Sequence, residues 1–163
     1  MEELIIKAKK GDKESFSKLI HIYQNDLYKI ARTRLNEEED IYDAIQDTII
    51  SSYESVSKLH KISSFKSWLI KILINKCNDI YRRKKYYVEL EENTIITNTD
   101  LSGNDINDLF KKLSADEKSI ILLHFIEGFS FKEISKILHI NENTVRSKLH
   151  RAKFKINNYN KEE

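Results

Sequence analysis

The residues best suited to chemistry lie in two basic segments, and the chemistry that they suit is nucleic-acid binding. The first segment ends in the run Tyr81-Arg82-Arg83-Lys84-Lys85-Tyr86-Tyr87, which interleaves cations with aromatic rings. The second segment, residues 141–155, contains five bases and one acid. Cations pair with phosphates, and aromatic rings stack on unpaired bases. We therefore interpret the first segment as a surface for single-stranded nucleic acid and the second as a surface for duplex DNA.

The second segment has the period of an amphipathic helix. Val145, Leu149, Ala152 and Ile156 recur every three or four residues and are expected to face inward. The outward positions carry side chains that bind base edges and phosphates, namely Asn143, Arg146, Ser147, His150, Arg151 and Lys153. The alternative is the solvated face of an ordinary surface helix. A short helix and a tight turn precede this segment, and that arrangement favours DNA binding.

The first segment belongs to a longer helix expected over residues 65–85. Its predicted buried stripe consists of Phe65, Leu69, Ile72, Leu73, Cys77 and Ile80. Its predicted polar face consists of Lys71, Asn75, Asn78, Asp79 and Arg82, spaced three or four apart. Trp68 fits either base stacking or the core, and its spacing from Phe65 and Leu69 favours burial.

Enzymatic chemistry is not expected from this inventory. The five histidines are scattered without metal-ligand spacing, and there is no glycine-rich phosphate loop. Cys77 lies on an apolar helical stripe, where an inert core thiol is expected rather than a nucleophile. We therefore expect no catalytic residue, no metal and no cofactor.

The elements that position these residues are predicted to be helices throughout. The chain of 163 residues has no proline and only three glycines, which favours an all-α fold. Helices are expected over residues 13–35, 38–56 and 65–85, with a loop at 57–64. Further along, Ser114 with Glu117 and Ser130 with Glu133 have the spacing of capping boxes. They predict two helices, the second ending near residue 138, followed by a turn at 139–141 and the basic helix. This is a helix-turn-helix pattern.

Helical periodicity fails between the two basic segments. We predict a first domain at 1–90, a flexible linker at 91–105 and a second domain at 106–163; a long surface loop within one domain is the alternative. No apolar run approaches the roughly 20 residues that span a membrane. The N-terminus lacks the pattern of a signal peptide, so we expect a cytoplasmic protein that is not itself embedded in a membrane.

Three motifs in this order resemble the extracytoplasmic-function (ECF) sigma factors. Residues 39–48, Glu-Asp-Ile-Tyr-Asp-Ala-Ile-Gln-Asp-Thr, look like the polymerase-binding helix of that family. Residues 64–72, together with Asn75, Asp79 and Arg82-Arg83, resemble the region that reads and opens the minus-ten element. Residues 113–117 and 143–152 resemble the domain that reads the minus-thirty-five element.

The resemblance implies a sigma factor that binds core RNA polymerase and opens promoter DNA. The residues implied in polymerase binding are Asp40, Asp43, Gln46 and Asp47. Those implied at the minus-ten element are His60, Ser63, Ser64, Lys71, Asn75, Asn78, Asp79, Arg82 and Arg83. Those implied at the minus-thirty-five element are Asn143, Thr144, Arg146, Ser147, His150, Arg151 and Lys153. An anti-sigma factor is a further implied partner.

The chain departs from the family pattern at four positions. These are Tyr42, where an acid is usual, Asn143, where a small residue is usual, Lys148, where arginine is common, and Leu73, where alanine is common. Two other readings stay open from the sequence. One is a helix-turn-helix repressor or activator with a helical sensing domain, and the other is a helical adaptor that binds only protein.

Overall fold

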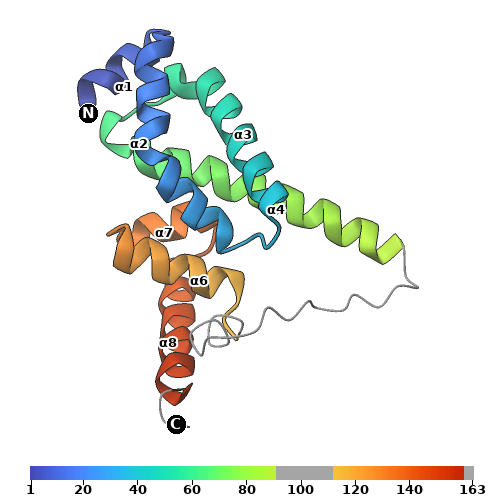
Figure 1. The fold of residues 1–163 in the computed structure, drawn as a ribbon. Helices are drawn as coiled ribbons and strands as arrows, with labels where there is room; N and C mark the ends of the chain where they lie inside the picture. Colours follow the sequence, from blue (N-terminus) through green and yellow to red (C-terminus); the bar gives the residue numbers. More distant parts are fainter. Residues whose placement is uncertain (91–111, 160–163) are drawn as a thin grey trace.

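The computed structural model describes residues 1–90 and 112–159, and every regular element in these ranges is a helix. The longer helices are α1 (Glu2–Lys9), α2 (Lys13–Arg32), α3 (Glu38–Ser55), α4 (Phe65–Leu90), α6 (Ala115–Ile121), α7 (Phe131–Leu138) and α8 (Glu142–Tyr159) (Figure 1). Short 3-10 turns occupy Val56–Lys58 and Ile62–Ser64, and a π-helical turn occupies Leu122–Ile126. The all-α prediction is confirmed. The predicted linker at 91–105 lies outside the described residues.

Helix α2 begins at Lys13, as predicted. The Asp12 side chain accepts a hydrogen bond from the backbone N–H of Glu14 at the start of α2. That helix ends at residue 32, three residues before the predicted end. The reason is that the N–H groups of Thr33 and Arg34 bond carbonyls only three residues back, which tightens the last turn. In contrast, α4 continues five residues beyond the predicted end at residue 85.

The C-terminal helices are the ones that the sequence located best. Both capping boxes are present, at Ser114 and at Ser130. His139 adopts the left-handed conformation with φ of 56° and ends α7, and Asn141 Oδ1 accepts the backbone N–H of Thr144 at the start of α8. The helix-turn-helix prediction is therefore confirmed as a local structure. No helix in the described parts of the chain is long and apolar enough to cross a membrane.

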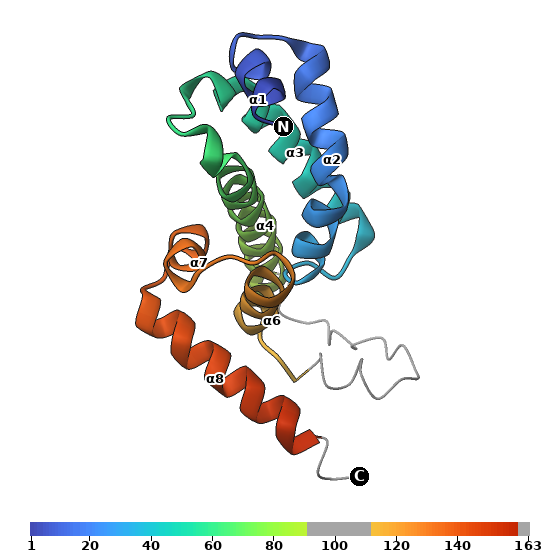
Figure 2. The ribbon, with the colours of Figure 1, turned by 90° about the vertical axis from the view of Figure 1, so that its left-hand side faces the viewer.

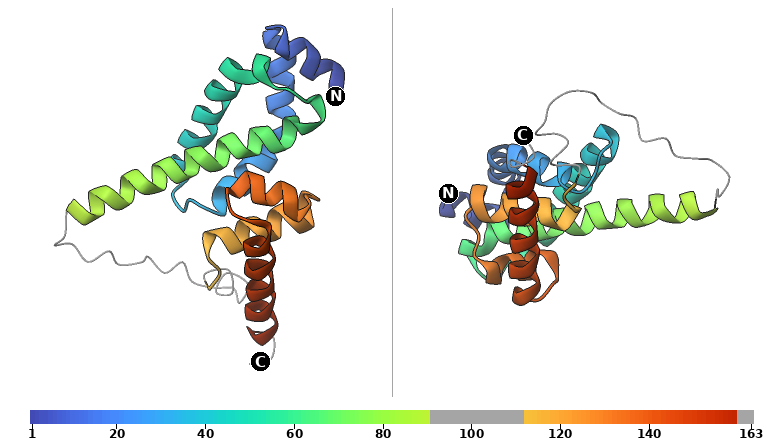
Figure 3. Two further views of the ribbon diagram at one scale, coloured as in Figure 1. Left: turned by 180° about the vertical axis from the view of Figure 1, so that it is seen from behind. Right: turned by 90° about the horizontal axis from the view of Figure 1, so that it is seen from below.

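The two halves of the chain pack against each other along α4. This helix contacts α2 and α3 on one side and α7 on the other, as Figure 2 and Figure 3 show from different directions. One continuous cluster of buried apolar residues extends from the N-terminal helices into α6, α7 and α8. The described residues therefore form two helical regions with a shared core.

Polar contacts also cross the boundary between the halves. Both terminal nitrogens of Arg34 donate to Asp116 Oδ1 at 3.0 Å. The hydroxyls of Thr33 and Ser119 lie 2.6 Å apart. Burial lowers the pKa of Arg34, and the carboxylate of Asp116 opposes that shift. Arg34 stays charged because an arginine pKa lies far above neutrality.

The buried face of α4 is wider than the predicted stripe. Ile70 and Ile74, which the stripe did not include, are fully buried. Ile72, which it did include, is only half-buried. The wider face follows from the packing of α4 between two layers, because a single helical stripe covers only one of them.

Candidate nucleic-acid interface

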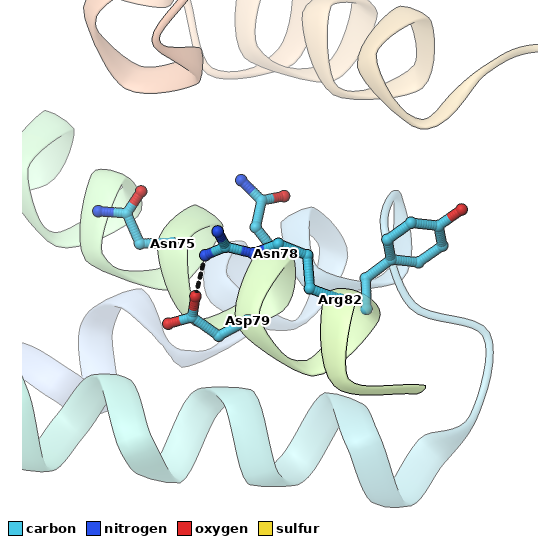
Figure 4. A pocket seen from close by; sticks show the side chains of 5 residues that line it. Asn75, Asn78, Asp79 and Arg82 are labelled. Carbon is cyan, nitrogen blue, oxygen red and sulfur yellow. Dashed lines mark hydrogen bonds and ion pairs between the residues drawn. The ribbon is translucent and has the colours of Figure 1, made fainter. Parts of the chain in front are cut away.

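The polar face of α4 forms an open depression of about 560 Å³. Asn75, Asn78, Asp79, Tyr81 and Arg82 line it (Figure 4). The guanidinium of Arg82 pairs with the carboxylate of Asp79 one turn earlier. Four of the predicted minus-ten residues therefore share one surface. Tyr81 joins them and was absent from the predicted set, although its place in the aromatic-basic run was the available signal.

The remaining predicted minus-ten residues on α4 lie on either side of this depression. Arg83 lines an adjoining depression together with Asp79, Arg82 and Tyr86. Lys71 lies one helical turn before Asn75 and is half-buried. Tyr81 and Tyr86 are each 61% exposed, so aromatic residues flank the cations. This combination suits phosphates and unstacked bases.

The loop before α4 is held by its own backbone and by α1. His60 and Ser63 are exposed, and Ser64 is half-buried with its hydroxyl donating to the carbonyl of Lys61 at 2.7 Å. From α1, Lys9 Nζ donates to the carbonyl of Leu59 at 2.5 Å. The loop is therefore anchored at one point while His60 and Ser63 face the solvent.

Three of the four residues on α3 that are predicted to bind core polymerase are exposed to solvent. Asp43, Gln46 and Asp47 are exposed. Asp40 differs, because its side chain is only 14% exposed and pairs with Lys84 of α4 at 2.5 Å. It therefore joins α3 to α4 in this structure. Tyr42 is 60% exposed and places an aromatic ring beside the acidic residues.

The recognition-type helix α8 has the predicted inward and outward faces. Val145, Leu149 and Ala152 are buried, and Ile156 is half-buried. The exposed predicted residues are Asn143, Arg146, Ser147, His150, Arg151 and Lys153. Thr144 is half-buried and its hydroxyl donates to Asn141 Oδ1, so it also serves the cap.

Two lysines of α8 point to the protein rather than away from it. Lys148 Nζ lies 3.0 Å from Asp116 Oδ2, and Lys155 Nζ lies 2.8 Å from Glu117 Oε2. Burial opposes ionisation of Glu117, but Lys155 and the backbone N–H of Ser114 lower its pKa below the ordinary value. Lys148 and Lys155 thus tie α8 to α6.

Two ambiguous residues of α4 belong to the packing. Trp68 is half-buried, with its ring centroid 5.6 Å from that of Phe65. Cys77 is fully buried, and burial raises the pKa of its thiol to about 12. A thiol with so high a pKa carries almost no thiolate at neutral pH, so its chemistry is suppressed.

Comparison with known proteins gives two family matches in the same order as the two basic helices. The family model for sigma-70 region 2 matches residues 19–86, and that for sigma-70 region 4 matches residues 104–156. The first range contains α3 and most of α4, and the second contains α7 and most of α8, the helix-turn-helix. Together the two matches cover most of the chain.

Individual relatives agree over nearly their full length. The RNA polymerase sigma factor SigV of Bacillus subtilis is 28% identical, with 90% of this chain and 92% of the relative covered. The ECF RNA polymerase sigma-E factor of Haemophilus influenzae is 29% identical, with coverage of 96% and 93%.

Solved structures show the same fold. The sigma factor RpoE of Bartonella quintana, in complex with the anti-sigma factor NepR, aligns with a TM-score of 0.76 at 22% identity, covering 91% of this chain and 98% of that one. The structure of CnrH with the cytosolic domain of CnrY aligns with a TM-score of 0.72 at 24% identity, covering 99% and 97%. Sigma factors are in general non-enzymatic initiation factors. This chain belongs to the sigma-70 family as a sigma factor of the ECF type, which acts with RNA polymerase in promoter-specific transcription initiation.

Proposed function

We propose that this chain divides promoter recognition and opening between its two basic helices while α3 binds core RNA polymerase. The observation that carries the proposal is the exposure of three distinct polar surfaces on one chain. They are the acidic face of α3, the depression on α4 and the outward face of α8. A repressor needs only the last of these, and a protein-only adaptor needs neither basic surface.

On α8, the exposed Arg146 and His150 suit duplex DNA. A recognition helix enters the major groove, where arginine bonds to guanine and smaller polar groups reach other base edges. Arg151 and Lys153 supply charge for phosphates, which set the affinity and its salt dependence. We assign this face to the minus-thirty-five element.

On α4, Asn75, Asn78 and Arg82 suit an opened strand. Extracting a base from a duplex costs a few kcal/mol of unstacking, which a binding surface must return. The depression supplies amide groups and a cation, and the neighbouring tyrosines supply rings for stacking. We assign this face, with His60, Ser63 and Ser64 of the preceding loop, to the minus-ten element.

On α3, Asp43, Gln46 and Asp47 suit a basic surface of core polymerase. Their exposure leaves them available, and the acidic first turn also suits the positive end of the helix. Asp40 takes part only if its pair with Lys84 is exchanged for a polymerase contact. We infer a protein without catalytic residues that works in the cytoplasm. The relatives solved with CnrY and NepR suggest an anti-sigma factor as a further partner.

The deciding experiment is a mobility shift of promoter-library duplex with the full chain, with and without core polymerase. A sigma factor of this type gives a specific complex only when core is present. A complex of equal specificity without core indicates a repressor or activator, and no complex in either case indicates an adaptor.

Asp43→Lys should weaken binding to core, whereas Glu2→Lys, which makes the same charge change on the exposed start of α1, should not. Equal core affinity in both variants would refute the role of α3.

A further inference from the structure

Arg146 is held in place before any DNA arrives. Its guanidinium carbon lies 4.7 Å from the centroid of the Phe131 ring, within the range of a cation–π contact. Its Nη2 also donates to Glu142 Oε1 at 2.6 Å, one helical turn earlier. The side chain is nevertheless 57% exposed. Arg146 is thus both fixed and accessible.

The ring under Arg146 is itself supported from behind. Phe131 is the first residue of α7, and its ring centroid lies 4.6 Å from that of His124. His124 Nδ1 donates to the carbonyl of Phe129 at 3.0 Å, so the imidazole is tied to the turn that leads into α7. The Phe131 ring therefore rests on a second ring whose position the backbone fixes.

A second cation on the outward face of α8, Lys153, also contacts an aromatic ring. His124 contacts the ring of Phe125 edge to face at 4.8 Å, and Lys153 Nζ lies 5.2 Å from the centroid of Phe125. Two cations of α8 thus contact aromatic rings from outside that helix: Arg146 contacts a ring of α7, and Lys153 contacts a ring of the π-helical turn. Neither ring belongs to α8, so the contacts also fix α8 relative to the preceding helices.

We propose that Phe131 is a positioning residue for the DNA-reading arginine Arg146, and that it sets sequence preference at one base pair of the upstream element. This inference rests on the proposed role of α8. An arginine that reads guanine must present its planar fork in one orientation, and a side chain free to rotate loses entropy on binding. Because the Phe131 ring already holds the guanidinium plane of Arg146 in one orientation, less entropy is lost when DNA binds. The ring also disfavours orientations that would accept other bases.

The test compares Phe131→Leu and Phe131→Met, which remove the ring but keep an apolar side chain, with Phe131→Tyr, which keeps the ring. Full chain and core polymerase are bound to a duplex library randomised over the upstream element, and the retained sequences are read out. Loss of one cation–π contact should weaken specific binding about two- to fivefold. The preference at one position should flatten in the Leu and Met variants and persist in the Tyr variant.

A double-mutant cycle separates positioning from a general loss of structure. In the Arg146→Ala background, Phe131→Leu should change neither affinity nor the sequence profile any further. Additive losses, an equal loss on every sequence, or tighter binding by Phe131→Leu would overturn the inference. If the sequence profile changes in Arg146→Ala but not in Phe131→Leu, Phe131 does not position Arg146, although the proposed role of α8 stands. An unchanged profile in Arg146→Ala would overturn the proposed role of α8 as well.

Discussion

The two helices α4 and α8 are both rich in basic residues, but they have different surroundings. α8 is covered along one face, where Val145 and Leu149 are buried, and its opposite face is open. α4 contacts helices of both halves, and Ile70 and Ile74 are buried on it in addition to the predicted stripe. The free face of α8 therefore follows from the helical period of its own residues. The free face of α4 depends on helices that come much later in the chain.

The pairing of cations differs in the same way. On α4, Lys66 lies between Asp26 of α2 and Glu127 of the C-terminal half, at 3.2 and 2.6 Å. It therefore joins the two halves. On α8, Lys148 and Lys155 pair with acids of α6 within the C-terminal half. The interface between the halves thus holds α4, whereas α8 is held by its own half.

The largest expected effect comes from removing the ion pair that joins the halves. Arg34→Ala removes the nearly buried guanidinium and both of its hydrogen bonds to Asp116, which keeps only Lys148 as a partner, and breaking a buried pair costs about 3 kcal/mol. Cys77 is fully buried on α4, so a thiol reagent reaches it only when the packing around that helix opens. We expect a thiol reagent at pH 8 to label Cys77 very slowly in the wild type, since its pKa is about 12. Labelling should accelerate about 100-fold in Arg34→Ala.

Arg32→Ala is the matched control for that experiment. Arg32 lies two residues away, and its pair with Glu38 is exposed on the surface of the N-terminal half. Equal labelling in Arg32→Ala and Arg34→Ala would mean that the Arg34 pair does not hold the halves together. The contrast between α4 and α8 would then rest on apolar packing alone.

The two helices should also differ in the step of promoter binding that each one affects. Arg146→Ala should reduce holoenzyme binding to intact duplex by about 1–3 kcal/mol, the cost of one good base contact. Asn75→Ala with Arg82→Ala should leave duplex binding nearly intact and reduce strand opening. Permanganate reactivity of unpaired thymines measures the opening.

A pre-melted template provides the control for this division of labour. It should rescue the Asn75 and Arg82 double variant more than Arg146→Ala, because it supplies the opened strand in advance. If both variants lose duplex binding equally and neither is rescued, α4 and α8 act as one surface.

The sequence predicted those features that depend on residues close together in the chain. The capping boxes, the turn at 139–141 and the two faces of α8 are of this kind, and all are confirmed. The second buried face of α4 was missed, because the helix contacts α7, which comes much later in the chain, as well as α2 and α3. The candidate site follows the same division. The outward set on α8 is exposed apart from the capping Thr144, whereas Asp40 is engaged by Lys84 of a different helix.

The third effect tests an uncharged contact of the same interface. Ser119 is fully buried, and Ser119→Ala removes its hydrogen bond with Thr33, at a cost of about 1 kcal/mol. Labelling of Cys77 should accelerate about fivefold, well below the effect of Arg34→Ala. Ser17→Ala, at an exposed position of α2, is the control and should leave the rate unchanged. A larger effect from Ser119→Ala than from Arg34→Ala would reverse the ranking of the two contacts.

The smallest effect concerns the open face of α8. Glu142 and Arg146 form an exposed pair one turn apart, which contributes about 0.3–0.5 kcal/mol to a helix. Glu142→Gln should therefore barely change the melting temperature.

The same substitution, Glu142→Gln, removes a negative charge beside the DNA-reading arginine, so binding to non-specific duplex should strengthen slightly. Because charge sets the salt dependence of such binding, a plot of log affinity against log salt should steepen by about one unit or less. Specificity should fall slightly, because a neutral amide oxygen restrains Arg146 less strongly than the carboxylate does. An unchanged salt slope with unchanged specificity would show that Glu142 lies outside the DNA interface, and that Phe131 alone restrains Arg146.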